Sequence, residues 1–156
     1  RRQLRALVWI VTAFTAGHSV TLIASAYGAA PSGLWFPPLV ETLIALSIFY
    51  MCVENVVCAN PRTRWPIAFA FGLVHGFGFS FALQNTLQFA GEHVLTSLLS
   101  FNVGIELGQL AFVLVVVAVK AAARSVAFPT PAWTRTVVVY AMGSLAAFWM
   151  IERALP

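Results

Sequence analysis

Long apolar runs separated by short polar breaks dominate the sequence. Five of these runs have about 20 or more residues, which is enough for a helix to cross a hydrocarbon core about 30 Å thick. They cover residues 4–29, 38–58, 65–84, 93–120 and 133–151. The alternating pattern typical of a membrane barrel is absent. The sequence therefore predicts an all-α fold, a polytopic transmembrane helical bundle of about five spans that forms a single domain over residues 1–156.

The fourth predicted span carries two stripes of residues that are not large and apolar. At about 100° per residue, Asn102, Glu106 and Gln109 share one face of a helix. The second stripe, on roughly the opposite face, consists of Ser100, Gly104 and Gly108. We therefore expect this helix to touch protein or a wet cavity on both sides, and not to lie at the lipid-facing edge of the bundle.

Composition and charge agree with a membrane protein. Hydrophobic residues make up 60% of the chain and charged residues 9%, with a mean hydropathy of +0.87, well outside the range of soluble domains. The basic residues lie before the first span and in the second and fourth breaks: Arg1, Arg2, Arg5, Arg62, Arg64, Lys120, Arg124 and Arg135; Arg153 is the exception. By the positive-inside rule this chain starts in the cytoplasm and ends outside it. The net charge of +4 thus reflects orientation in a lipid bilayer and implies no nucleic-acid partner.

Three ionisable side chains, those of His18, His75 and Glu106, fall near the centres of three different predicted spans. A charged group at the bilayer centre costs roughly 2.5–3.5 kcal/mol on insertion scales, and such residues usually face the interior and mark a site or pathway. Two imidazoles and a carboxylate also suit nickel, cobalt, zinc or iron. Asn102 and Gln109 would complete the ligand shell or orient the ligands by hydrogen bonds. The sequence therefore predicts a site for a divalent transition metal ion.

The second predicted span adds further polar residues. Glu41 lies near its outer end and Glu54 near its inner end, while Ser47 shares a face with Glu54. In a metal permease the two glutamates would act as outer and inner relay carboxylates. A structural reading is equally reasonable for both, because a glutamate within a turn of the headgroups reaches water at little cost.

The third predicted span is rich in glycine. Gly72 and Gly76 form a small-xxx-small pair that lets a neighbouring backbone approach closely, and His75 lies beside this groove. Breaks in the helix at Gly72, Gly76 or Gly78 would instead expose backbone carbonyls to an ion, as in transporters with discontinuous helices.

The remaining candidates have simpler interpretations. The spacing of Cys52 and Cys58 matches no metal or redox motif, so both are interpreted as packing residues. Glu92 and His93 are expected to be solvated loop residues. The fifth span has no buried ionisable residue and is expected to serve packing only.

Four blocks of the sequence resemble the HupE/UreJ membrane family in its second, less characterised branch. They are residues 14–22, 41–55, 71–79 and 101–109. The resemblance covers about residues 1–120 and implies a multipass bacterial inner-membrane protein that permeates nickel or cobalt. The family pattern also has a preceding span with a His and an Asp-His motif, which is missing here. This sequence begins on a basic loop without an initiator Met, so it looks like a fragment of a longer chain.

Other classes of protein stay open at this point. His18 and His75 lie at matching depth and would suit axial ligation of a haem in an electron-transfer subunit. A metallocentre assembly factor or a structural membrane subunit, with or without homo-oligomer formation, would also explain the polar residues as interhelical bonds. The sequence contains no His-Glu-x-x-His, Gly-x-Ser-x-Gly or phosphate-loop motif, so we do not expect an enzyme.

Overall fold

The computed structural model describes residues 2–57, 64–87, 93–125 and 133–155, and over these residues the chain is helical and contains no strand. The five helices are α1 (Arg2–Ala26), α2 (Phe36–Val57), α3 (Arg64–Leu87), α4 (Val94–Ser125) and α5 (Trp133–Ala154). Each predicted apolar run coincides with one helix, which confirms the all-α prediction. Four of them, α1 from Leu4 onwards, α2, α4 and α5, are long and apolar enough to cross a membrane. Since α3 is not among these over its described residues, a fifth span stays a prediction.

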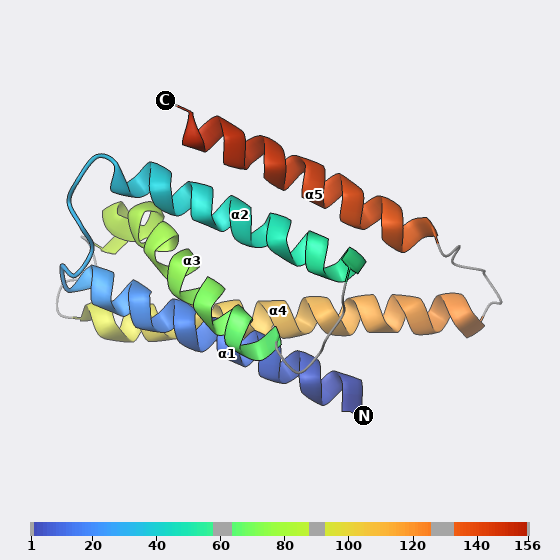
Figure 1. The fold of residues 1–156 in the computed structure, drawn as a ribbon. Helices are drawn as coiled ribbons and strands as arrows, with labels where there is room; N and C mark the ends of the chain where they lie inside the picture. Colours follow the sequence, from blue (N-terminus) through green and yellow to red (C-terminus); the bar gives the residue numbers. More distant parts are fainter. Residues whose placement is uncertain (1, 58–63, 88–92, 126–132, 156) are drawn as a thin grey trace.

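The helices pack in an order that differs from their order in the chain. The main contacts join α4 to α1, α1 to α3, α3 to α2 and α2 to α5. Figure 1 shows α3 crossing α1 near the middle of the bundle, with α4 alongside α1 and α5 alongside α2. The N- and C-termini lie at opposite ends of the bundle. The centre of the bundle is therefore the α1–α3 pair, and α4 and α5 flank it.

The α1–α3 crossing depends on three glycines. A Cβ atom added at Gly17 would collide with the Phe69 carbonyl oxygen, and one at Gly72 would collide with the carbonyl of Phe14. A Cβ at Gly76 would overlap the side chain of Thr21. The hydroxyl group of Thr21 also donates a hydrogen bond of 2.7 Å to the carbonyl of Leu73. The predicted small-residue groove on α3 is thus present, and α1 fills it.

The prediction of a broken third helix is wrong. α3 is a single helix from Arg64 to Leu87, and the closest neighbours of Gly72 and Gly76 belong to α1. Glycine permits a helix to unwind, and it also permits two backbones to approach closely. Here Gly72 and Gly76 serve the close contact between the backbones of α1 and α3.

A glycine in a left-handed conformation ends α1. Gly28 has a φ of 85°, which costs glycine little because it has no Cβ. The amide of Gly28 donates to the carbonyl of Ser25, and the amide of Ala29 donates to the carbonyl of Ala24, both at 3.0 Å. This pair of bonds is a Schellman motif, which satisfies the last carbonyls of the helix and turns the chain sharply. The loop that follows leads to Pro37, whose missing N–H is tolerated in the first turn of α2.

Contrary to the expectation from the sequence, the small-residue stripe of α4 is exposed in the described structure and does not touch protein there. Ser100, Gly104 and Gly108 are exposed, and nothing lies within 4 Å of a Cβ added at either glycine. The opposite face of α4, which carries the buried Asn102, packs on α1. Within the described part of the chain α4 is therefore a peripheral helix, because only its amide and carboxylate face meets protein.

α5 packs against α2 as a closing helix. Gly143 is buried and lies opposite Cys52, so that a Cβ on this glycine would be 3.3 Å from the cysteine Cβ. Cys52 is a free, buried cysteine, in agreement with its predicted packing role, whereas Cys58 lies outside the described residues. The expectation that α5 serves packing is consistent with this contact.

The crossing makes a prediction about stability. Replacing Gly72 by Ala should destabilise the protein by about 1–3 kcal/mol, because the added methyl group must push two backbones apart. The matched control is Gly104→Ala, which adds the same methyl group in open space and should be neutral or stabilising by up to about 1 kcal/mol through helix propensity. Unfolding in detergent, followed by far-UV circular dichroism, measures both. Equal stabilities of the two variants would contradict the close crossing.

Candidate functional site

The imidazole of His18 is the most deeply buried ionisable side chain in the described structure, with 1% of the residue exposed. It stacks on the ring of Phe14 at a centroid distance of 6.1 Å and meets the edge of Phe79 at 5.2 Å. Neither ring nitrogen has a hydrogen-bond partner among the described residues. A buried polar group without a partner costs about 1–3 kcal/mol. A hydrogen bond between helices therefore does not explain why His18 is buried.

His75 belongs to α3, the partner of α1 in the crossing, and it shares a neighbouring side chain with His18. Its ring meets the ring of Phe14 at a centroid distance of 5.1 Å. Its Nδ1 atom is 2.8 Å from the carbonyl oxygen of Phe71, one turn earlier in α3. With the proton on Nδ1, the ring donates to this carbonyl and Nε2 keeps its lone pair, which is the usual arrangement of a metal-binding histidine.

The polar face of α4 meets α1 and the interior. Glu106 accepts a hydrogen bond of 2.7 Å from the hydroxyl group of Thr12. Asn102 donates to the carbonyl of Leu98 at 2.9 Å. The side-chain oxygens of Asn102 and Gln109 are buried and have no partner among the described residues. Two amide oxygens and one carboxylate are thus held on one face of α4, and two of these three groups have unused acceptor capacity.

The structure does not gather the three central ionisable residues into one compact set. In the described ranges, no group of three or more His, Cys, Asp or Glu side chains is placed to hold a single ion. His18 and His75 are linked through Phe14 on α1. Glu106 is instead bonded to Thr12, one and a half turns before His18 on α1. Depth in the membrane places residues at one level, but it does not bring them together.

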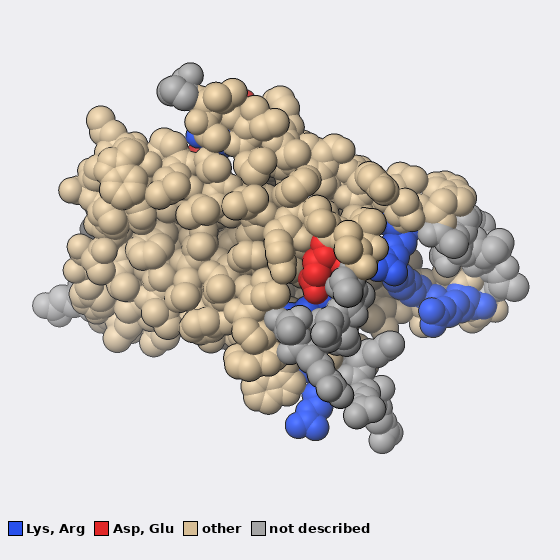
Figure 2. Space-filling view, viewed as in Figure 1, with Lys and Arg blue, Asp and Glu red and all other residues tan. Residues whose placement is uncertain are grey.

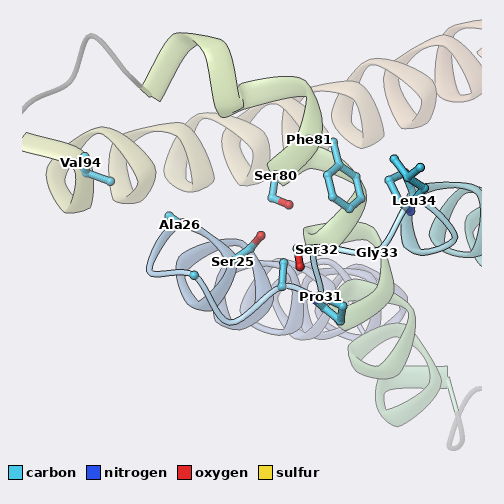
Figure 3. A pocket seen from close by; sticks show the side chains of 12 residues that line it. Ser25, Ala26, Pro31, Ser32, Gly33, Leu34, Ser80, Phe81 and Val94 are labelled. Carbon is cyan, nitrogen blue, oxygen red and sulfur yellow. The ribbon is translucent and has the colours of Figure 1, made fainter.

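Two hollows lie on either side of His18 along α1 and α3. After the orientation that the sequence predicts, we call the hollow at the end where α1 stops the outer pocket and the other hollow the inner cavity. The outer pocket has a volume of about 590 Å³, and its lining includes Ser25, Pro31, Ser32, Ser80, Phe81 and Val94 (Figure 3). The inner cavity has a volume of about 390 Å³, and its lining includes Phe14, Ser47, Asn55, His75, Gln109 and Met142. On α1, His18 falls between the two lining sets, and its neighbour Phe79 does the same on α3. Along these two helices, His18 and Phe79 therefore lie between the two hollows.

The relay candidates on α2 have different surroundings. Ser47 is buried, lines the inner cavity and donates to the carbonyl of Ile44 at 2.7 Å. Glu54 pairs with Arg64 at 3.4 Å, and its second carboxylate oxygen is buried without a partner in the described structure. Glu41 is an exposed residue that pairs with Arg153 at 3.2 Å. Ser47 and Glu54 thus belong to the inner half of the bundle, whereas Glu41 takes part in a surface ion pair near the other end.

Asn55 connects three helices at the inner end of the bundle. Its side-chain oxygen accepts from Arg64 at 2.8 Å, and its backbone carbonyl accepts from Arg135 at 2.7 Å. On the face shown in Figure 2, the larger groups of Lys and Arg side chains gather at this end, beside an acidic side chain. Asn55, which lines the inner cavity, is therefore held in place by two arginines from other helices.

Sequence reasoning missed three residues of this region. Thr12 was not singled out as a partner of Glu106, and the aromatic rings of Phe14 and Phe79 carry no signal beyond apolarity. The one available clue was the polar spacing of threonines on α1. Of the two predicted loop residues, His93 is exposed as expected, and Glu92 lies outside the described residues.

Comparison with known proteins decides the family. A family model described as HupE / UreJ protein matches residues 1–153. The chain belongs to the HupE/UreJ family. No curated protein and no solved structure matches it. The match extends beyond the resemblance in the sequence, which covers about residues 1–120, and it takes in the described part of α5. This HupE/UreJ protein is thus a membrane protein whose buried polar residues, within the described structure, lie on α1, α2, α3 and α4.

The unpartnered imidazole makes a prediction about this HupE/UreJ protein. His18→Leu removes two buried polar atoms without removing a hydrogen bond to the described residues, so the free energy of unfolding should stay unchanged or rise by about 1 kcal/mol. The contrasting variant is Thr21→Val, which loses the bond to Leu73 and should be destabilised by about 0.5–1.5 kcal/mol. Circular dichroism during unfolding in detergent distinguishes the two. A loss in His18→Leu as large as that in Thr21→Val would show that the imidazole is structural.

Proposed function

We propose that this protein binds a divalent transition metal ion, of the nickel or cobalt type, and passes it through the bundle as a permease. The ion is cargo, and the protein is not an enzyme. The proposal places the protein in the bacterial inner membrane, with the inner cavity facing the cytoplasm, because the basic residues concentrate at that end. Membership of the HupE/UreJ family supports a role in metal handling.

One observation carries the proposal: the imidazole of His18 is buried between two hollows and has no described partner for either nitrogen. Imidazole nitrogen is a good ligand for nickel, cobalt and zinc. An ion that binds there would remove the cost of the unpartnered nitrogen. A structural bond between helices, which is the main alternative for a histidine in a membrane span, would have required a partner.

The arrangement favours transfer between successive ligands over one closed site. His18 and His75 both contact Phe14, and His75 lines the inner cavity together with Gln109 and Ser47. We propose that the ion moves from His18 to His75 and then into this cavity, where the amide oxygen of Gln109 offers a further ligand. Conduction requires sites weak enough, or numerous enough, for the ion to leave.

The carboxylates take different places in this proposal. Glu106, held by Thr12 at the α1–α4 contact, and the amide of Asn102 on the same helix would supply oxygen ligands on α4, apart from the two histidines. Glu54 is the proposed inner relay, because one of its carboxylate oxygens is buried without a partner in the described structure while the other pairs with Arg64. Glu41 is left out of the route since it pairs with Arg153 at the surface.

The close crossing weighs against a haem. A haem with His18 and His75 as axial ligands would need a macrocycle between the two imidazoles. The backbones of α1 and α3 are in contact at Gly17, Gly72 and Gly76, on the same stretch of both helices. Inserting a macrocycle there would require these helices to separate.

Metal content and binding stoichiometry of the detergent-purified full-length protein test the proposal. Elemental analysis, followed by titration with nickel and cobalt, should find stoichiometric binding in the wild type. His18→Ala and His75→Ala should each weaken binding by at least about 10–100-fold, the loss typical even for outer-shell partners of metal sites, and Glu106→Gln should also lose affinity. Circular dichroism should show that all three variants remain folded.

The matched control for this experiment is Glu41→Gln, which removes a carboxylate outside the proposed route and should keep wild-type affinity. Absence of binding by the wild-type protein would overturn the proposal. Wild-type affinity in both histidine variants would overturn the assignment of the ligands.

A further inference from the structure

Three serine hydroxyl groups from three separate segments surround the outer pocket. Ser25 belongs to the last turns of α1, Ser32 to the loop that follows the Gly28 turn, and Ser80 to α3. Figure 3 shows their oxygen atoms around the same space. Ser80 is 8% exposed and donates its proton to the carbonyl of Phe77 at 2.6 Å, so its oxygen faces the pocket as an acceptor. The pocket therefore offers hydroxyl oxygens from three segments, of which that of Ser80 is held by a hydrogen bond.

The lining chemistry does not suit a bare transition metal ion. The described lining of the outer pocket contains no His, Cys or charged residue, and imidazole or thiolate is what such ions select. Hydroxyl oxygens are good acceptors for the protons of water molecules bound to a cation. The pocket also carries no Lys or Arg among these residues that would repel a cation.

The size of the pocket is adequate for an ion with its water shell. Six water molecules occupy about 180 Å³ at the roughly 30 Å³ that each takes in the liquid, whereas the pocket measures about 590 Å³. Ser25 and His18 are seven residues apart on α1, which corresponds to about 10 Å along the helix. The first imidazole is thus about two turns deeper than the hydroxyl groups.

We propose that the outer pocket binds a divalent cation with its hydration shell intact, and that the ion loses water only further in, at His18. The first half of this proposal concerns a hydrated cation in the pocket and stands on the pocket alone. The second half rests on the proposed function. Separating the two steps lets the serine hydroxyls hold the ion through its water before imidazole nitrogen replaces that water.

Cobalt(III) hexaammine is a suitable probe for the first half. Its six ammonia ligands donate hydrogen bonds as bound water does, but they do not exchange, so the complex can occupy the pocket and cannot be ligated by His18. In a Cys52→Ala, Cys58→Ser background, Ala26→Cys, which lies in the lining and leaves all three serines intact, would be labelled with a membrane-impermeant maleimide. At about ten times its dissociation constant, hexaammine should slow this labelling roughly tenfold, because only the empty pocket reacts.

Leu155→Cys is the matched control, since Leu155 is 66% exposed near the C-terminus and outside the described lining of the pocket. Its labelling should not change with hexaammine. Ser32→Ala combined with Ser80→Ala should raise the hexaammine concentration needed to protect Ala26→Cys, whereas His18→Ala should leave it unchanged. Absence of protection, equal protection of Leu155→Cys, or protection that disappears in His18→Ala would each overturn the proposal.

The outcomes separate this inference from the proposed function. If hexaammine protects the cysteine but the protein binds neither nickel nor cobalt, the hydrated-ion pocket is supported and the proposed permease function is rejected. Stoichiometric binding that depends on the histidines, without protection by hexaammine, would support the metal route and overturn the hydrated-ion pocket.

Discussion

The close contact between the backbones of α1 and α3 is the constraint on which the rest of the structure depends. Inside a membrane, helices gain little from burying apolar side chains, because lipid is equally apolar, and close packing of small residues takes over this role. Gly17, Gly72 and Gly76 supply that packing. Two of these glycines directly precede or follow a histidine in the chain: Gly17 precedes His18 and Gly76 follows His75. The contact that holds the helices together thus also fixes both imidazoles at its edges, where the ring of Phe14 touches each of them.

The buried polar atoms that lack a hydrogen-bond partner also lie inside this bundle. Those recorded in the described structure belong to His18, Glu54, Asn102 and Gln109, on three different helices. Natural proteins satisfy most buried polar groups, and exceptions concentrate where function requires them. Here, Gln109 lines the inner cavity, His18 lies between the two hollows, and Glu54 is adjacent to cavity-lining Asn55. Among the described residues, α3 and α5 contribute none of these atoms: α3 makes the close contact with α1, and α5 packs mainly against α2.

The sequence predicts the helices well because physical limits leave few choices. The thickness of the hydrocarbon core sets their length, and the need to satisfy every backbone group inside the membrane makes them helical. It also predicts the polar face of α4 and the groove at Gly72 and Gly76. It does not predict which helices adjoin: pairings such as Glu41 with Arg153 join residues far apart in the chain. For the same reason, equal depth of His18, His75 and Glu106 could not show that Glu106 bonds to Thr12 instead of joining the histidines.

The dispersed placement of these ligands bears on what the protein does with an ion. A resident structural metal is held by about four ligands in a closed shell, and such a site releases its ion slowly. His18 and His75 instead both contact the ring of Phe14, and His75 lines the inner cavity together with Gln109 and Ser47. On the proposed route each stop would offer few protein ligands, water would supply the rest, and binding at each stop would be correspondingly weak. A series of weak sites between the two hollows would suit passage, whereas one strong site would hold the ion in place.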